Sequence, residues 1–236
     1  MKTSDFIPDK YRVCVVSAAN GNAEWQAQLT NPNKDAYCRR HGYDFKYARL
    51  EGGDPHFAKY GLVEKEILTG AYDYVVWMDT DAWFNADVPF SRVIDRYSEK
   101  DTALIIARDH GMLGCDRRLF DCYLNTGVMV FKSDGNGLEV IRRYGNLHED
   151  QTARRMVESL TEWRDQPYMC LLAIVDEFVR SKTAIASPYA LNAFAQLGFS
   201  EDTFICHLPS VWAKKYLEDR VKRSAAPPVP ELGLNA

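Results

Sequence analysis

The chain has 236 residues, of which 46% are hydrophobic and 26% are charged, with 14 glycines and 10 prolines. This composition is that of an ordinary globular protein, and it excludes collagen-like, coiled-coil and low-complexity chains. The 29 basic and 33 acidic side chains give a net charge of −4. That balance argues against binding to nucleic acid, because such proteins neutralise phosphates with an excess of positive charge.

Strand-like and helix-like stretches alternate along the first half of the chain. Strands are predicted at 11–17, 43–48 and 72–78, the first of them followed by a turn of small residues at 18–21. A helix runs up to residue 40 and another covers 55–69, and Gly42 and Gly70 suit the position just after each. Strands that alternate with helices predict a parallel sheet covered by helices.

The second half carries shorter patterns. Helices are predicted around 90–97 and at 138–144, 152–160, 167–179 and 211–220, and strands at 103–107, 127–131 and 204–208. From Ser224 onward the chain holds three prolines and no periodicity, as linkers and free ends do. We therefore expect one α/β domain over residues 1–223 and a disordered tail or linker over 224–236.

The strongest predicted strand ends in Asp79-Thr80-Asp81, and α/β sheets bind ligands at the carboxyl ends of their strands. Two carboxylates one residue apart can hold Mg²⁺ or Mn²⁺ with positions open for phosphate oxygens. An Asp-rich turn without a ligand gives the same pattern. Phosphatases of the haloacid-dehalogenase type also carry D-x-D after a hydrophobic strand, but Trp83 stands where they have Thr or Val, and no later acidic pair is evident.

Residues 74–82 (YVVWMDTDA) resemble the core of nucleotide-sugar-dependent glycosyltransferases of GT-A fold. They are most similar to the galactosyl-, mannosyl- and xylosyltransferase group of fungi and plants, whose motif reads W-x-D-x-D-A. Three further segments resemble that group in order: 33–43 (NKDAYCRRHGY), 57–59 (FAK) and 124–128 (LNTGV). The resemblance covers residues 11–215. It implies a single GT-A domain with a Rossmann-like, mostly parallel sheet flanked by helices, and sugar transfer from a UDP-sugar donor to a hydroxyl of a glycan acceptor.

The resemblance also implies a metal cofactor, Mn²⁺ or Mg²⁺. Asp81 would ligate it directly, and Asp79 would contact the ribose or reach the metal through water. A late histidine supplies a third ligand in such folds, and His207 after the apolar run 204–206 matches it best, with a structural core histidine as the alternative. Lys214 resembles a lysine that binds the diphosphate, although a solvated lysine on a helix face fits the sequence equally.

Donor recognition is expected at the end of the first strand, where small residues let a nucleotide base approach the backbone. There is no G-x-G-x-x-G segment there, so NAD binding is unsupported. The Asn-Thr-Gly segment resembles the part of the family that meets the sugar, and it is also an ordinary turn sequence. Lys59 is either a further positive group for the donor or an exposed lysine on a helix. The expected donor site comprises Ser17, Ala18, Asn20, Lys59, Asp79, Thr80, Asn125, Thr126, Gly127 and Lys214.

Residues 163–167 (WRDQP) resemble segments that direct an acidic or amide group at the anomeric carbon. Asp165 is predicted to be the catalytic base of an inverting enzyme. In a retaining enzyme, Asp165 or Gln166 would instead stabilise an oxocarbenium-like centre. An Asp just before a helix with Pro167 in its first turn is also a good N-cap.

The sequence departs from the eukaryotic group, which has a membrane anchor and stem, Trp in place of Phe57 and an acid in place of Pro167. No window reaches the about 18 apolar residues of a membrane span, so we expect a soluble, cytoplasmic enzyme of bacterial or viral type. Four aromatic residues are candidates for an acceptor groove or for the core: Trp83, Trp163, Tyr168 and Trp212. The alternative function is a catalytically silent nucleotide-sugar or glycan-binding module, with further domains of a longer chain joined through the linker-like tail.

Overall fold

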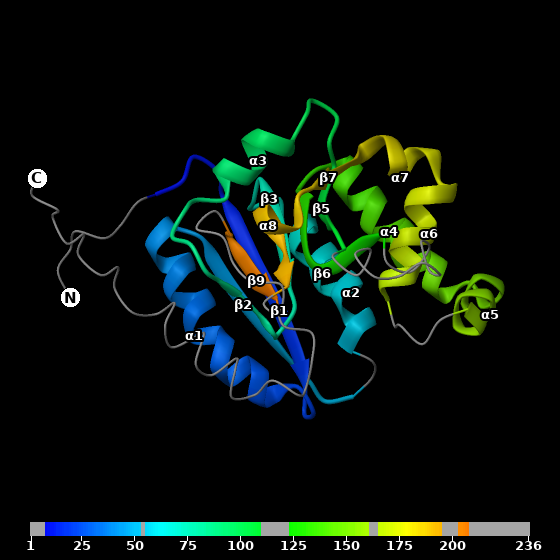
Figure 1. Cartoon of the computed structure of the whole chain (residues 1–236), viewed down its shortest axis with the longest axis horizontal. Coiled ribbons are helices and arrows are strands. Elements are labelled where there is room, and N and C mark those ends of the chain that lie inside the picture. The colour runs from blue at the N-terminus through cyan, green and yellow to red at the C-terminus, as the bar shows by residue number, and fades with distance from the viewer. Residues whose placement is uncertain (1–7, 53–54, 110–122, 161–164, 195–202, 208–236) are drawn as a thin grey trace, which may run out of the picture.

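The fold was obtained as a computed structural model, which describes residues 8–52, 55–109, 123–160, 165–194 and 203–207 (Figure 1). The strands within these ranges are β1 Val13–Asn20, β2 Asp44–Leu50, β3 Tyr74–Met78, β4 Ala82–Phe84, β5 Leu104–Arg108, β6 Leu124–Lys132, β7 Thr183–Ala186, β8 Ala193–Phe194 and β9 Ile205–His207. The helices are α1 Glu24–His41, α2 Pro55–Leu68, α3 Ser91–Tyr97, α4 Gly135–Glu149, α5 Gln151–Leu160, α6 Gln166–Val175, α7 Glu177–Lys182 and α8 Pro188–Leu191.

Six of the strands form a central sheet in the order β2-β1-β3-β6-β5-β7. Neighbouring strands are parallel in the pairs β1–β2, β1–β3 and β5–β7. β6 runs antiparallel to both of its neighbours, β3 and β5. The mostly parallel sheet predicted from the sequence is thus confirmed, and β6 places its first residues at the edge where β3 and β5 end.

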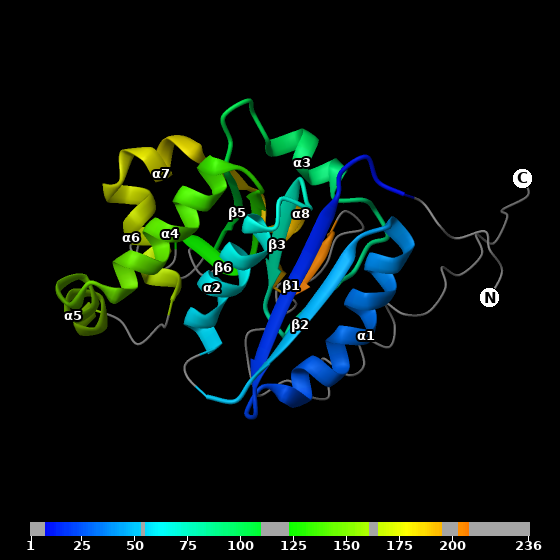
Figure 2. The same cartoon turned by 180° about the vertical axis from the view of Figure 1, so that it is seen from behind.

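The inner strands β1, β3, β5 and β6 are buried on both faces, because their successive residues enter two different cores. Along β3, Val75 and Trp77 belong to a core shared with α2, α4 and α6, while Val76 and Met78 belong to one shared with α1, α3, β4 and β9. Figures 1 and 2 show the two faces. This explains the nearly continuous apolar sequence of β1 and β3, which is typical of a strand covered on both sides.

A second, small sheet has the order β4-β9-β8. β4 follows β3 after a turn of three residues and pairs antiparallel with β9, and this pairing sets Ala82 opposite His207. Both sheets therefore meet where the chain leaves β3.

Most of the predicted elements are present, with shifted ends. The two helix-ending glycines are confirmed, since Gly42 and Gly70 have φ of 74° and 64°, values that favour glycine. β1 continues to Asn20, through residues expected to turn. The helix predicted over 167–179 is wrong: the chain breaks into α6 and α7 at Asp176, which is extended and accepts a hydrogen bond from the Val179 backbone N–H.

The predicted helix at 211–220 and the tail lie outside the described residues. None of the helices in the described part of the chain combines the length and the apolar character needed to cross a membrane.

Candidate metal and donor site

The D-x-D segment forms the tight turn between β3 and β4. The Asp79 backbone N–H donates to the Gly127 carbonyl (2.8 Å), and the Ala82 N–H donates back to the Asp79 carbonyl (3.1 Å). The turn therefore leaves the carboxyl end of β3, as the sequence predicts, with Asp81 at the start of the second sheet.

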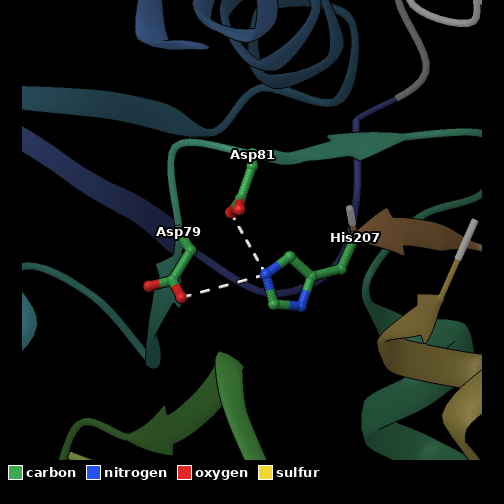
Figure 3. Close-up of side chains that lie close together, drawn as sticks. All are labelled: Asp79, Asp81 and His207. Carbon is green, nitrogen blue, oxygen red and sulfur yellow. Dashed lines mark ion pairs between the residues drawn. The ribbon is translucent and has the colours of Figure 1, made fainter. Parts of the chain in front are cut away.

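His207 meets these two carboxylates because β9 lies beside β4. Its Nε2 lies 3.1 Å from Asp81 Oδ1 and 4.0 Å from Asp79 Oδ2 (Figure 3). One ligand atom from each of the three residues lies within 4.8 Å of the others. Two carboxylate oxygens with one imidazole nitrogen are a donor set that can hold a divalent metal ion. The three residues proposed as ligands from the sequence thus come together.

The contacts within the cluster shift the pKa values of His207 and Asp81 in directions that favour a charged pair. Burial lowers the pKa of His207, but the charge and hydrogen bond of Asp81, together with the charges of Asp79 and Asp109, outweigh it and raise the pKa overall. Burial raises the pKa of Asp81, but the charge and hydrogen bond of His207, a backbone hydrogen bond and the charge of Lys34 together outweigh it and lower the pKa overall. A divalent cation would take the place of the imidazolium proton, because a metal ligand must be deprotonated.

Gly127 makes room for the imidazole. A Cβ atom at this position would lie 2.4 Å from Cε1 and 2.6 Å from Nδ1 of His207. The sequence analysis assigned Gly127 to the donor, whereas the structure places it against His207. Because it lies within β6, the Asn-Thr-Gly segment is part of a strand and not the turn considered as the alternative.

Asp79 is held through one of its two carboxylate oxygens. The indole N–H of Trp77 donates to Oδ1 (2.6 Å), and Lys59 Nζ lies 3.5 Å from the same oxygen. This leaves Oδ2 on the side of His207. The sequence analysis did not assign a role to Trp77, although it is the first residue of the W-x-D-x-D-A motif.

Lys59 and Asp165 form a buried ion pair. Lys59 is 1% exposed, so it is not the exposed helix lysine of the alternative, and its Nζ lies 2.7 Å from Asp165 Oδ2. Thr126 Oγ1 (2.8 Å) and Tyr144 OH (3.0 Å) donate to the same oxygen. Burial raises the pKa of Asp165, but the charge and hydrogen bond of Lys59, the charge of His56 and the hydrogen bond of Thr126 together outweigh it and lower the pKa. Asp165 makes no side-chain hydrogen bond that caps α6.

A neighbouring polar group joins Gln166 and Asn125 to Asp109. The side-chain amides of Asn125 (3.0 Å) and Gln166 (2.8 Å) both donate to Asp109 Oδ2. Asn125 Oδ1 accepts from the Gly127 N–H (2.9 Å) and from the Asn192 amide. Neither Asp109 nor Asn192 was predicted from the sequence. A signal for Asp109 exists, since it directly follows β5, which runs in the same direction as β3.

Of the remaining predicted donor residues, Ser17, Ala18 and Thr80 are buried, whereas Asn20 is not. Ser17 is fully buried and accepts a hydrogen bond from Lys34 Nζ (3.2 Å), and Ala18 is buried. The Thr80 hydroxyl donates to Gln26 Oε1 (3.3 Å). Asn20 is partly exposed at the end of β1.

Two of the four aromatic candidates for an acceptor groove are core residues. Trp83 is 0% and Tyr168 1% exposed, so neither presents a face to a sugar. Trp163 and Trp212, together with the diphosphate candidate Lys214, lie outside the described residues.

No family model matches this sequence, and no curated protein does either. Solved structures match it by fold. A glycosyltransferase involved in the glycosylation of the major capsid of PBCV-1 has 16% identity and a TM-score of 0.66, over 89% of this chain and 99% of that chain. The fold is of the GT-A type.

Two further glycosyltransferases share this fold. The galactosyltransferase LgtC, solved with donor and acceptor sugar analogs, has 13% identity and a TM-score of 0.57, over 92% of this chain and 98% of its own. GlyE of Streptococcus pneumoniae TIGR4 has 15% identity and a TM-score of 0.56, over 89% of this chain and 61% of its own. The fold expected from the sequence motifs is confirmed. Sequence identities this low establish a shared fold and nothing beyond it.

Proposed function

We propose that this chain is a metal-dependent glycosyltransferase that moves a sugar from a UDP-sugar to a hydroxyl of a glycan acceptor. The observation that carries the proposal is the meeting of Asp79, Asp81 and His207 at one edge of a GT-A sheet. Glycosyltransferases with the same fold support the reaction class. The preference for UDP rests on the resemblance of the sequence motifs.

Mn²⁺ or Mg²⁺ fits the three side chains, and when bound it would neutralise charge on the diphosphate leaving group. The protein needs such a cation because Lys59 is already committed. Its Nζ lies 2.7 Å from Asp165 and 3.5 Å from Asp79, so little of its charge remains for a donor. We assign Lys214 to the diphosphate as well, on the motif resemblance. An acidic protein can thus hold an anionic donor without a basic surface.

We assign the donor sugar to the polar group of Asp109, Asn125 and Gln166. A carboxylate and two amides offer both acceptors and donors, which is what recognition of several hydroxyls requires. Their present hydrogen bonds to one another keep these buried groups satisfied. Sugar hydroxyls would replace part of that set on binding.

Asp165 is assigned to stabilise positive charge at the anomeric centre, the second of the two roles considered for it. Three donors converge on its Oδ2 and Lys59 lowers its pKa. Hydrogen bonds to the ionised form make a carboxylate a weaker base, which disfavours proton abstraction. Lys59 faces both Asp165 and Asp79, so these three side chains keep one net negative charge, which is suited to oppose a developing positive charge.

Release of UDP from a panel of UDP-sugars, with Mn²⁺ or with a chelator and with candidate glycan acceptors, tests the proposal. We expect turnover of at least one UDP-sugar that requires the metal, and loss of that turnover in Asp81→Asn. Asp101→Asn, the same change at a side chain that is 69% exposed, should behave as wild type. Absence of metal-dependent turnover from every UDP-sugar, with every acceptor, would contradict it and favour a silent binding module.

A further inference from the structure

Helix α1 lies against the main chain of the D-x-D turn. Thr30 Oγ1 donates a hydrogen bond to the Thr80 carbonyl (2.5 Å), and Lys34 Nζ donates to the Asp79 carbonyl (2.8 Å). Both side chains are one turn of the helix apart and both are 0% exposed. Two consecutive carbonyls of the turn are therefore held by side chains of α1.

Lys34 also ties the turn to the first strand. Its Nζ donates to Ser17 Oγ on β1 (3.2 Å) and to Thr30 Oγ1 (3.3 Å). These contacts use the three donors of the ammonium group on β1, α1 and the D-x-D turn. Burying a lysine is costly, and an apolar side chain of similar length would fill the same space without that cost. That cost is offset here by hydrogen bonds to three buried polar groups, one of which is a carbonyl of the D-x-D turn.

The opposite side of the turn is fixed as well, by the hydrogen bond from the Asp79 N–H to the Gly127 carbonyl. The main chain between β3 and β4 is thus held from α1 on one side and from β6 on the other. The carboxylates of Asp79 and Asp81 extend from this turn toward His207 (Figure 3). Metal–ligand distances tolerate deviations of only about 0.2 Å, so the position of this main chain decides whether the three ligands fit one ion.

We propose that Thr30 and Lys34 are positioning residues for the metal centre, which hold the carbonyls of Thr80 and Asp79 so that the ligand side chains converge. The metal is that of the proposed function, on which this inference rests. The competing role for Lys34 is that of a counter-charge, which balances Asp79 and Asp81 without fixing their geometry.

The two roles predict opposite signs for the effect of Lys34→Met on binding of Mn²⁺. Burial lowers the pKa of Lys34 to about 7. Where Lys34 is protonated, removing its positive charge by itself tightens cation binding. Loss of a group that orients metal ligands weakens it, by about 10- to 100-fold for supporting residues in metal sites. Thr30→Val gives a second test, since it removes a hydrogen bond to the turn without a change of charge and with little change of shape.

The dissociation constant for Mn²⁺, measured on the full chain by the electron paramagnetic resonance signal of free Mn²⁺, tests the proposal without use of activity. We expect weaker binding in Thr30→Val and in Lys34→Met. Thr152→Val and Lys65→Met, the same changes at exposed helix positions, should bind as wild type. Thermal unfolding by circular dichroism establishes that each variant is folded, and if Lys34→Met does not fold, Thr30→Val decides.

Unchanged or tighter Mn²⁺ binding in folded Thr30→Val and Lys34→Met would overturn the positioning role and leave the proposed function standing. Failure of the wild-type chain to bind Mn²⁺ would instead refute the metal centre itself, and the positioning role with it.

Discussion

Adding a single methyl group at Gly127 should damage the metal centre. In Gly127→Ala the new Cβ would lie 2.4 Å from Cε1 of His207, while ordinary contact begins at 3.4 Å. The imidazole would have to retreat by about 1 Å, several times the about 0.2 Å that metal–ligand distances tolerate. We therefore expect Mn²⁺ to bind about 10- to 100-fold more weakly, a loss of about 1.4–2.7 kcal/mol.

Titration of Mn²⁺, followed by the resonance of the free ion, measures this effect. Gly61→Ala is the matched control, because it makes the same change in helix α2 where nothing lies within 4 Å of the added Cβ. It should bind Mn²⁺ as wild type. Wild-type affinity in Gly127→Ala, with an unchanged melting temperature, would refute the packing of His207 against β6 as the determinant of its position.

Three further outcomes are expected. Asp165→Asn leaves the buried charge of Lys59 poorly compensated, so the free energy of unfolding in urea should fall by about 3 kcal/mol. Adding Lys59→Met to this variant should restore part of that loss. Additive losses in the double variant would contradict the ion pair. Burial lowers and the charge of Asp81 raises the pKa of His207, with a net rise above 6.5. The proton on His207 therefore stabilises the metal-free fold below pH 6.5, and this stabilisation is lost as the pH rises through the raised pKa. Because Mn²⁺ binds the deprotonated imidazole, the affinity for Mn²⁺ should increase over that range. An affinity independent of pH would contradict this. Gly42→Ala, at a φ of 74°, should lower the free energy of thermal unfolding by about 1 kcal/mol, and wild-type stability would argue against the left-handed cap.

Local sequence was enough to predict the elements with a strong pattern. The end of α1 follows from Gly42, since a left-handed residue after the helix favours glycine. The place of Asp79 follows from the apolar run before it, because a strand buried on both faces admits charges only where it ends. These features depend on residues close together in the chain, and the motif resemblance added the GT-A fold itself.

What the sequence could not supply depends on contacts between distant segments. Strands β4, β7 and β8 have two to four residues, too few to display a period, and they exist because a partner strand pairs with them. The burial of Lys59 depends on Asp165, which lies on another element. The role of Gly127 depends on the β4–β9 register, which brings His207 over it. Spacing along the chain carries none of this information.

The place of Asp109 in the site was not predicted, for a different reason. Asp109 lies two residues after the predicted strand at 103–107, whereas Asp79 directly follows its strand. A single Asp near the end of a strand is common and gives no motif. Only the strand order, with β5 parallel to β3, places it beside Asn125 and Gln166. A search for carboxylates at the ends of all predicted strands would have included it.

Binding of UDP, measured by isothermal titration calorimetry with Mn²⁺ and with a chelator, tests most directly whether the three ligands hold a cation that carries the donor diphosphate. We predict that the wild-type chain binds UDP with Mn²⁺ and loses this binding with the chelator, and that Asp81→Asn binds UDP under neither condition. Equal affinity of the wild-type chain for UDP with Mn²⁺ and with the chelator would contradict the metal-mediated donor site.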